Sequence, residues 1–460
     1  MKFRMKNKIN KLVFALPFIL ILLCPVCFAN TAKDITNQVE IICSGISRDR
    51  ICDNNIATHS SGSNVSISIT SDIPMGGIYV KYNSIPSEGT LSDTTKIAQN
   101  GFLHEYINLG SSTNAVLSYP SVDICDIFVY SEGELPTDVQ VWKMPDNETD
   151  ILLCATHSDD DQLFFAGLLP YYAKCKNADV VVAYFINHYD TYNRTHELLD
   201  GLWHCGVTNY PDISPFPDGY SESVDGAMNF LKSRGVTYDE VLSYQKALLE
   251  RYKPLVAVLH DFNGEYGHGA HMLNTKSFIE VCEASSDGEH IPEKIYVHLY
   301  DQNKIELDID TPYDELSGKS PFNISQEAFM YHKSQHWTWF YGWIYGKGEK
   351  ITSSKQITSY SPTSYGLYHS SVGEDTAKND LLENVVTYEE RRIALQQNEQ
   401  QNQEKSQSEV SSSYEISPDV SQNKTDIEKK EFSPFYLLPF IIVIMIILSI
   451  ALININKKKR

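Results

Sequence analysis

Residues 151–169 read ILLCATHSDDDQLFFAGLL, and this stretch decides the fold. Its first five residues, 151–155, are apolar and have the length of a buried strand. His157 and three consecutive aspartates, Asp159, Asp160 and Asp161, follow before the apolar pattern resumes. Adjacent carboxylates repel one another unless water or a cation surrounds them. Because the ligands of parallel sheets bind beyond the carboxyl ends of the strands, this position predicts a binding site.

The chain from this strand onward alternates between strand-like and helix-like patterns. We expect strands at residues 151–155, 180–186, 255–260 and 295–300. We expect helices at residues 162–174, 195–205, 238–253 and 273–284. Such alternation predicts an α/β fold with a Rossmann-like parallel sheet and helices on both faces. No Gly-x-Gly-x-x-Gly sequence follows the first strand, which argues against a dinucleotide site.

The preceding region, residues 36–145, has the pattern of an all-β domain. Short β-branched or aromatic runs alternate with turn residues, at 63–70, 76–83, 115–120, 125–132 and 138–144. Regular spacing of this kind predicts an antiparallel sandwich. The final phrase of the region, IFVYSEGELPTDVQVWKMP, resembles the end of a galactose-binding-like, discoidin-type jelly roll. That resemblance implies glycan binding, and a structural spacer is the alternative interpretation.

Both ends of the chain have the features of targeting segments. Residues 1–29 combine a basic start, an apolar stretch and a small-residue cleavage site, which is typical of a secretory signal peptide. A retained N-terminal anchor is the alternative. Residues 435–455 carry no charge and are long enough to cross a bilayer, and the basic tail 456–460 indicates a cytoplasmic end. We therefore expect a single-pass protein of the cell membrane, with most of its chain extracellular.

Composition separates the domains from the membrane segment and excludes one class of partner. Residues 396–433 are rich in Gln, Asn, Ser, Glu and Lys and have few aromatic residues, so we expect a disordered linker there. The formal net charge of the chain is −21. Nine of its cations lie in the two terminal segments, so the part between them is more acidic still. A nucleic-acid binder normally carries a basic face, which is not visible in this sequence, so we expect no nucleic-acid partner.

The cysteines favour neither a metal knuckle nor a disulfide framework. Of the nine cysteines, Cys24 and Cys27 fall within the predicted signal peptide. The seven that remain include no Cys-x-x-Cys pair, and their number is odd. Cys43 and Cys52 are the candidates for a pair outside the cell, where disulfides persist.

A second group of metal-binding residue types follows the predicted strand 255–260. The sequence there reads HDFNGEYGHGAHML and places His268 and His271 three residues apart, on one face of a helix. A catalytic zinc site uses about three protein ligands and one open position for water. His157 and an aspartate after one strand, with a histidine after another, would form such a set. A bound dication would also offset the repulsion between the adjacent aspartates.

Four segments resemble, in order, the motifs of the PIG-L/LmbE-like de-N-acetylases, zinc enzymes that remove acetyl from N-acetylglucosamine-type sugars. These segments are His157-Ser-Asp-Asp-Asp161, Arg194-Thr-His-Glu197, Tyr266-Gly-His-Gly-Ala-His271 and His332-Lys-Ser-Gln335. The resemblance covers about residues 148–340 and implies a deacetylase domain that, with a C-terminal extension, spans residues 148–395. It implies the Rossmann-like fold and an N-acetylated sugar or glycan as substrate.

The resemblance also implies which residues bind the metal and which one acts as the base. His157, Asp160 and His271 would bind Zn2+ or another divalent metal. Asp159 would be the general base that takes a proton from the zinc-bound water as it attacks the acetamide. Amide hydrolysis needs this activation, and zinc lowers the pKa of a bound water to about 7.

Three further residues would act on the substrate. His268 would face the developing oxyanion or protonate the leaving amine, and Tyr266 would polarise the substrate carbonyl. Arg194 would contact the sugar. The first motif departs from the family pattern at two positions, with Ser158 in place of proline and Asp161 in place of glutamate. Neither position supplies a metal ligand, although the shorter Asp161 puts the substrate or metal preference of the family in doubt.

Two other functions remain as alternatives. A non-catalytic glycan-binding surface protein would use the β domain, and a metal-dependent hydrolase of another bond, such as an ester, would use the same ligands. An Asp159→Asn substitution separates binding from hydrolysis, because only hydrolysis needs the base. The aromatic segment HWTWFYGWIYG, residues 336–346, also has two interpretations, a sugar-stacking platform or a plug of the core.

Overall fold

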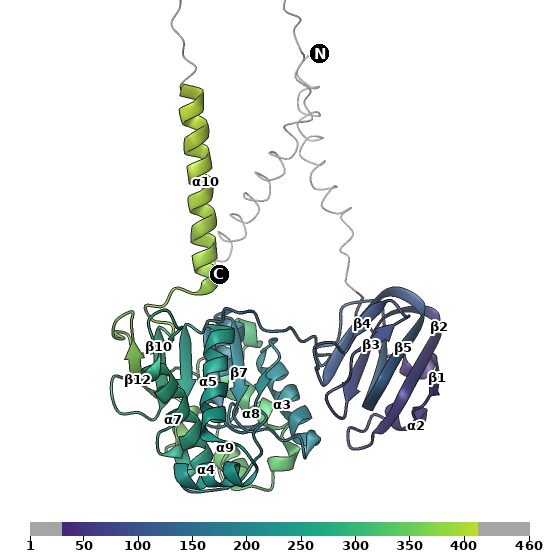
Figure 1. The fold of residues 1–460 in the computed structure, drawn as a ribbon, viewed down its shortest axis with the longest axis horizontal. Helices are drawn as coiled ribbons and strands as arrows, with labels where there is room; N and C mark the ends of the chain where they lie inside the picture. The colour runs from purple at the N-terminus through teal and green to yellow at the C-terminus, as the bar shows by residue number, and fades with distance from the viewer. Residues whose placement is uncertain (1–29, 413–460) are drawn as a thin grey trace, which may run out of the picture. The chain divides into compact units, whose positions relative to one another are not determined.

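The computed structural model describes residues 30–412 (Figure 1). The predicted signal peptide 1–29, transmembrane segment 435–455 and basic tail 456–460 lie outside the described residues. Among residues 30–412, no helix is both long enough and apolar enough to cross a membrane. The described residues form two β-sheets, one of five strands and one of seven.

The first sheet has the strand order β1-β2-β5-β3-β4. Its elements are η1 (Thr36–Gln38), β1 (Glu40–Ser44), α2 (Arg48–Ile51), β2 (Ser60–Tyr82), β3 (Gly89–Leu91), β4 (Thr95–Ile97) and β5 (His104–Ser131). Along β2 and β5 the partner numbers run in opposite directions, with Ser66 opposite Ser118, which is antiparallel pairing. Val65, Ile67 and Ile69 are buried at every second position, as the geometry of a strand requires.

The structure corrects the predicted strands of this region in two respects. The run 63–70 and all but the last residue of the run 76–83 are part of β2, and the runs 115–120 and 125–132 fall almost entirely within β5. Residues 138–144 form no strand and contribute only an isolated bridge between Lys143 and Asn209. Gln140 and Trp142 are buried there because they pack against a helix instead of pairing in a sheet. The ring centroids of Trp142 and Trp203, for example, lie 5.4 Å apart.

The second sheet has the order β11-β12-β10-β9-β6-β7-β8. Its strands are β6 (Ile151–Ala155), β7 (Val180–Tyr184), β8 (Asp212–Ile213), β9 (Val256–Leu259), β10 (Lys294–His298), β11 (Lys304–Glu306) and β12 (Ser364–Ser370). Adjacent strands from β10 to β8 are parallel, while β12 pairs antiparallel with both β10 and β11. The predicted parallel sheet is therefore present, with an antiparallel edge that the sequence pattern did not indicate.

Helices cover both faces of this sheet, as predicted. The helices are α3 (Tyr192–Cys205), α4 (Val224–Ser233), α5 (Tyr238–Tyr252), α6 (Gly264–Gly267), α7 (Gly269–Ala284), α8 (Pro321–Phe329) and α9 (Trp339–Tyr345), with η3 (Asp314–Leu316), η4 (Lys333–Gln335) and η5 (Ser354–Gln356). Leu153 and Val182 pack in one cluster with residues of α3 and α8. Leu152 and Val181 point the other way and pack with residues of α5 and α7 (Figure 1). Strands buried on both faces explain the continuous apolar runs of the sequence.

The strand order places a switch point at β6. From β6 the chain proceeds to β7 and β8 on one side, and then returns to form β9 and β10 on the other. Because β6 pairs with both β7 and β9, the loops that follow β6 and β9 begin next to each other. Crevices of this kind are where open α/β sheets bind their ligands. The fold thus brings residues 156–161 close to residues 260–271.

The helix predicted at 162–174 is present only in its second half. Residues 158–167 form successive turns, and helical backbone begins at Leu168 and continues as the π-helix η2 (Pro170–Cys175). Gly167 has a φ of +83°, outside the helical region, and Pro170 has no N–H to donate to a helical hydrogen bond. The apolar side chains of the segment are nevertheless buried, which is why their pattern resembled that of a helix.

Two expectations about the remaining described residues also differ from the structure. Residues 396–412, predicted to be disordered, belong to α10 (Tyr388–Ser412). A capping interaction begins this helix, since the Thr387 hydroxyl donates to the Glu390 carboxylate at 2.9 Å and accepts from the Glu390 N–H at 3.3 Å. Cys43 and Cys52 are free thiols, and burial raises the pKa of Cys52 to about 11.

Candidate metal centre

The loop after β6 is folded around the carboxylate of Asp160. Its Oδ2 atom accepts hydrogen bonds from the backbone N–H groups of Thr156, at 3.2 Å, and His157, at 2.7 Å. The same oxygen lies 3.3 Å from Nδ1 of the His157 ring. Both side chains are buried. A turn so closely tied at its backbone holds the two side chains at the end of the strand in fixed positions.

The loop after β9 and the start of α7 carry the residues that face His157 and Asp160. His268 is the N-cap of α7, and its Nδ1 accepts from the N–H of Ala270 at 3.2 Å. His271 lies in the first turn of that helix and is fully buried. Between them, Gly269 allows close approach, since a Cβ there would lie 2.3 Å from Oγ of Ser221. The N-terminus of α7 therefore packs closely against the loop that contains Ser221, and the imidazoles of His268 and His271 lie at this end of the helix.

The three predicted metal ligands meet at one point. His157 Nδ1 lies 3.1 Å from His271 Nε2, and Asp160 Oδ2 lies 3.3 Å from each of these nitrogens. Ligand atoms about 2.0 to 2.1 Å from a tetrahedral zinc lie about 3.3 to 3.4 Å from one another. The donor atoms, their types and their separations therefore fit a zinc-sized ion. His268 and His260 also bring ligand atoms within 4.8 Å of this cluster.

The electrostatics of the cluster favour a positive charge. Burial opposes protonation of His157, yet Asp160 and Asp218 raise the pKa of this imidazole to about 10. Burial alone would raise the pKa of Asp160, but the imidazoles of His271 and His157 hold it well below its ordinary value. A carboxylate kept ionised in a buried place requires a cation beside it. A divalent metal would meet that requirement.

Asp159 lies beside this cluster with one oxygen available. Its Oδ1 is 3.5 Å from Nη2 of Arg194. Its Oδ2 is buried and has no hydrogen-bond partner among the residues that the structure describes. Burial raises the pKa of Asp159 to about 6, against the opposing effect of Arg194. This carboxylate therefore has the position and the free oxygen that a proton acceptor needs.

Tyr266 and His268 line the same place on its outer side. The Tyr266 ring centroid lies 5.5 Å from that of His268 and 5.7 Å from that of His271. Burial, with the nearby Asp160 and Asp159 carboxylates, raises the pKa of Tyr266, so its hydroxyl keeps its proton. Burial lowers the pKa of His268 to about 2, and its Nδ1 already accepts a hydrogen bond. The neutral ring of His268 therefore carries its proton on Nε2, where it is able to donate.

The sequence pattern missed several residues around this centre, among them His188 and Asp218. Asp218 Oδ1 lies 3.5 Å from His157 Nε2, and Asp218 Oδ2 lies 3.4 Å from His188 Nε2 and 3.8 Å from Arg194 Nη1. His188 Nδ1 in turn lies 2.6 Å from the Ser158 hydroxyl. Asp218 follows β8, a strand of two residues that has no periodic pattern to detect. A search for polar residues just beyond every strand end would have found His188, which follows β7.

Residues of the second and fourth motifs contact each other and the residue that follows the first motif. Glu197 of α3 accepts from the N–H of Ser334 at 2.9 Å and from the Ser334 hydroxyl at 2.5 Å. His332 is hydrogen-bonded to Gln162, which follows the aspartates directly. These contacts join the second and fourth motifs to the first.

The aromatic segment 336–346 does two things in the structure. Ile344 is fully buried in the core. Trp339 is 43% exposed, and its ring centroid lies 5.7 Å from that of Tyr266. An exposed indole thus stands beside the residues that surround the cluster, while the following turn of α9 anchors it.

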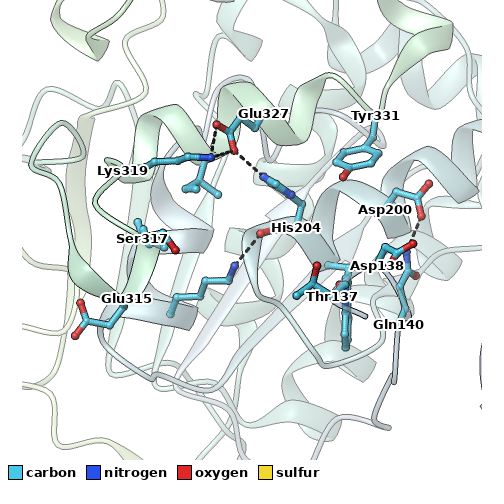
Figure 2. Close-up of a pocket in the computed structure, with 14 residues that line it drawn as sticks. Thr137, Asp138, Gln140, Asp200, His204, Glu315, Ser317, Lys319, Glu327 and Tyr331 are labelled. Atoms are coloured by element: carbon cyan, nitrogen blue, oxygen red, sulfur yellow. Dashed lines mark hydrogen bonds and ion pairs between the residues drawn. The ribbon is translucent and has the colours of Figure 1, made fainter. Parts of the chain in front are cut away.

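A separate cavity of about 300 Å³ lies between α3, α8 and the segment 315–319, and contains none of the predicted site residues. Figure 2 shows that several of its charged and polar groups pair with one another. Lys319 Nζ lies 2.7 Å from Oε1 of Glu327, His204 Nε2 lies 3.2 Å from Oε2 of Glu327, and Gln140 Nε2 donates to Asp200 at 2.6 Å. Within the described part of the chain, no buried atom without a partner belongs to its lining. The cavity therefore shows no built binding site.

Comparison with known proteins gives likenesses at low identity. No family model matches the chain, and no curated protein does. The solved N,N'-diacetylchitobiose deacetylase of Pyrococcus horikoshii is similar at 13% identity, over 48% of this chain and 83% of that one, with a TM-score of 0.33. A conserved protein of Thermus thermophilus is similar at 16% identity, over 41% of this chain and 80% of that one, with a TM-score of 0.30.

One further similar structure is a carbohydrate-binding module, CBM32-3, from a family 31 glycoside hydrolase of Clostridium perfringens. It is 13% identical over 22% of this chain and 95% of that module, with a TM-score of 0.17. At these identities and scores, the function of this chain has to be argued from its own residues and their geometry.

Proposed function

We propose that this chain is a metal-dependent de-N-acetylase that hydrolyses the acetamide of N-acetylglucosamine-type glycans. One observation carries the proposal. His157, Asp160 and His271 come from two loops at the switch point of the sheet, and their ligand atoms lie 3.1 to 3.3 Å apart. Three buried ligand atoms at this spacing, next to a carboxylate oxygen of Asp159 that has no partner among the described residues, form the arrangement expected of a hydrolytic metal site.

The metal would be held by His157, Asp160 and His271. When bound, zinc or a similar dication lowers the pKa of a coordinated water and polarises a carbonyl oxygen. The residues around it then have separate tasks. Asp159 accepts the proton of the attacking water on its free Oδ2, while Arg194, 3.5 Å from Oδ1, holds the carboxylate in place.

Tyr266 and His268 act on the substrate amide. Tyr266 retains its hydroxyl proton, so it donates a hydrogen bond to the oxygen on which negative charge develops. His268 carries its proton on Nε2, because its Nδ1 accepts from the N–H of Ala270. From there it donates a hydrogen bond to the developing oxyanion, while the leaving amine receives the proton that Asp159 took from the water when the C–N bond breaks. Two donors and one acceptor therefore surround the place where the acetamide would sit.

The sugar ring would lie toward Trp339 and Arg194. The indole of Trp339 is partly exposed beside Tyr266 and offers an apolar face to a pyranose. We further propose that the protein is extracellular, held in the membrane by residues 435–455, and that its β domain, residues 36–145, binds glycan. A membrane anchor and an extracellular glycan-binding domain would keep the enzyme next to a polymeric substrate.

Acetate release tests the proposed function. The purified chain is loaded with zinc and assayed with N-acetylglucosamine oligomers of increasing length. We expect acetate release that a chelator abolishes and added zinc restores. The matched variant Asp159→Asn should bind zinc and glycan as the wild type does and release far less acetate. Zinc-loaded, folded protein that binds these oligomers without releasing acetate would instead indicate a non-catalytic glycan-binding protein.

A further inference from the structure

A buried glutamate, Glu265, lies behind the candidate metal centre and touches three imidazole rings. Its Oε2 is 2.6 Å from Nδ1 of His271. Its Oε1 is 3.0 Å from Nδ1 of His260 and 2.9 Å from Nδ1 of His298, and it also accepts from the N–H of Asp261 at 3.0 Å. The side chains of Glu265 and the three histidines are fully buried. The sequence analysis did not identify Glu265 as a site residue.

These contacts determine where each imidazole carries its hydrogen. An ionised carboxylate only accepts hydrogen bonds, so each ring must present Nδ1–H to Glu265. In a neutral ring, Nε2 then has a free lone pair. His271 Nε2 is the atom that lies 3.3 Å from Asp160 Oδ2 in the metal-binding cluster. His260 Nε2 points to the same oxygen at 3.4 Å and has no hydrogen-bond partner among the described residues.

The backbone of Glu265 is strained. Its φ of +51° and ψ of −86° lie in a region that side-chain-bearing residues rarely adopt. The flanking Gly264 and Gly267 also have positive φ values, of +69° and +90°. Glycine would meet the backbone requirement at position 265 without strain. A glutamate there is therefore explained by what its carboxylate does.

We propose that Glu265 is a positioning residue that holds His271 in the Nδ1–H form, with Nε2 free to bind the metal. Glu265 holds His260 beside it in the same form, so that its Nε2 is available as a further metal ligand. The inference rests on the proposed function, since it concerns the same metal. Carboxylates that accept from the far nitrogen of a metal-binding histidine raise its ligand strength and fix its ring. Here the Glu265 carboxylate fixes the ring of the proposed ligand His271 and the ring of the neighbouring His260 at the same time.

Two variants separate positioning from a merely structural role. Glu265→Gln keeps the shape of the side chain, but its amide N–H₂ cannot accept from an imidazole N–H. Glu265→Gly removes the carboxylate and relieves the backbone strain. Lys253→Gly is the matched control, because Lys253 is exposed, has a φ of +41° and caps α5 away from the cluster. All three are made in the full chain.

The first measurement is zinc affinity, by competition with a chromophoric chelator, together with the thermal midpoint of the metal-free protein. We expect zinc affinity to fall about 10- to 100-fold in both Glu265 variants and to stay unchanged in Lys253→Gly. Unchanged zinc affinity in folded Glu265 variants would overturn the proposal, even if their thermal midpoints shift. If wild-type protein itself fails to bind zinc, it is the proposed function that fails.

The second measurement needs no metal. ¹⁵N chemical shifts of the histidine rings report which nitrogen carries hydrogen. Metal-free wild type should show His271 and His260 as Nδ1–H, and Glu265→Gln should convert at least one of them to Nε2–H. Identical tautomers in both proteins would contradict the positioning role, whatever the metal affinity.

Discussion

Nδ1 of His157 lies 3.1 Å from Nε2 of His271, although 114 residues separate the two histidines in the chain. The contact arises because His157 follows β6 and His271 follows β9, and these strands are neighbours in the sheet. Two imidazole nitrogens this close have one hydrogen between them or share a cation. The first three predictions below follow from the second possibility, and the last concerns a different pair of buried histidines.

Zinc should stabilise the folded protein. A ligand that binds only the folded state at about 100 times its Kd adds about 2.7 kcal/mol to the free energy of unfolding. We expect this gain in urea titrations with zinc and its loss with a chelator. His271→Gln should remove the gain, whereas His369→Gln, a change at a partly exposed position, should keep it. Equal stabilisation of His271→Gln would show that zinc binds elsewhere.

Asp159→Asn should separate binding from hydrolysis. The amide cannot take a proton, so we expect kcat to fall by about 10²- to 10⁴-fold, the usual contribution of a general base. Zinc affinity should change little, because the proposed ligands are His157, Asp160 and His271. Acetate release and chelator competition measure the two effects on the same preparation. A variant with wild-type kcat would rule out Asp159 as the base.

Asp218→Asn should weaken metal binding without abolishing it. Asp218 lies 3.5 Å from His157 Nε2 and helps that ring to present Nδ1 to the cluster. Loss of such a carboxylate costs about 10- to 100-fold in metal affinity or activity. Asp225→Asn, on the neighbouring helix α4, is the matched control. Equal effects of the two substitutions would mean that a general loss of acidic charge is responsible.

The metal-free protein should lose stability in acid partly through two buried histidines, His104 and His196. Nε2 of His104 lies 2.7 Å from Nδ1 of His196, and both rings are buried. Burial lowers the pKa of His104 well below its ordinary value and that of His196 to about 3. Because the unfolded chain takes up these protons below about pH 6.5, this contribution is complete above that pH and falls as pH decreases.

The expected slope is about 1.4 kcal/mol per pH unit for each of these histidines below pH 6.5. Urea titrations between pH 7.5 and pH 4.5 measure it. The double variant His104→Asn/His196→Asn should have a flatter profile than wild type, whereas His369→Asn should not. A double variant that keeps the wild-type slope would assign the acid sensitivity to other groups.

Much of the α/β domain follows from local sequence patterns. The strands β6, β7, β9 and β10 and the helices α3, α5 and α7 lie where their apolar periodicity predicts them. The failures have local causes as well. Residues 162–174 have a helical pattern but contain a positive-φ Gly167 and are helical only in their second half, and residues 138–144 pack on α3 without pairing in a sheet. The apolar side chains of 162–174 are buried as their pattern indicates, whereas in 138–144 Gln140 is buried and Val141 and Met144 are exposed.

The sequence by itself determined which chemistry is available, because His157 and the aspartates follow a buried strand within one loop, where spacing along the chain sets their proximity. The resemblance already indicated that this loop meets His271, but the tertiary structure alone decided that Asp218 joins His157 and that Glu265 contacts His271. The physical reason is the strand order of the sheet. Neighbouring parallel strands end at the same edge, and no local pattern records which strands become neighbours.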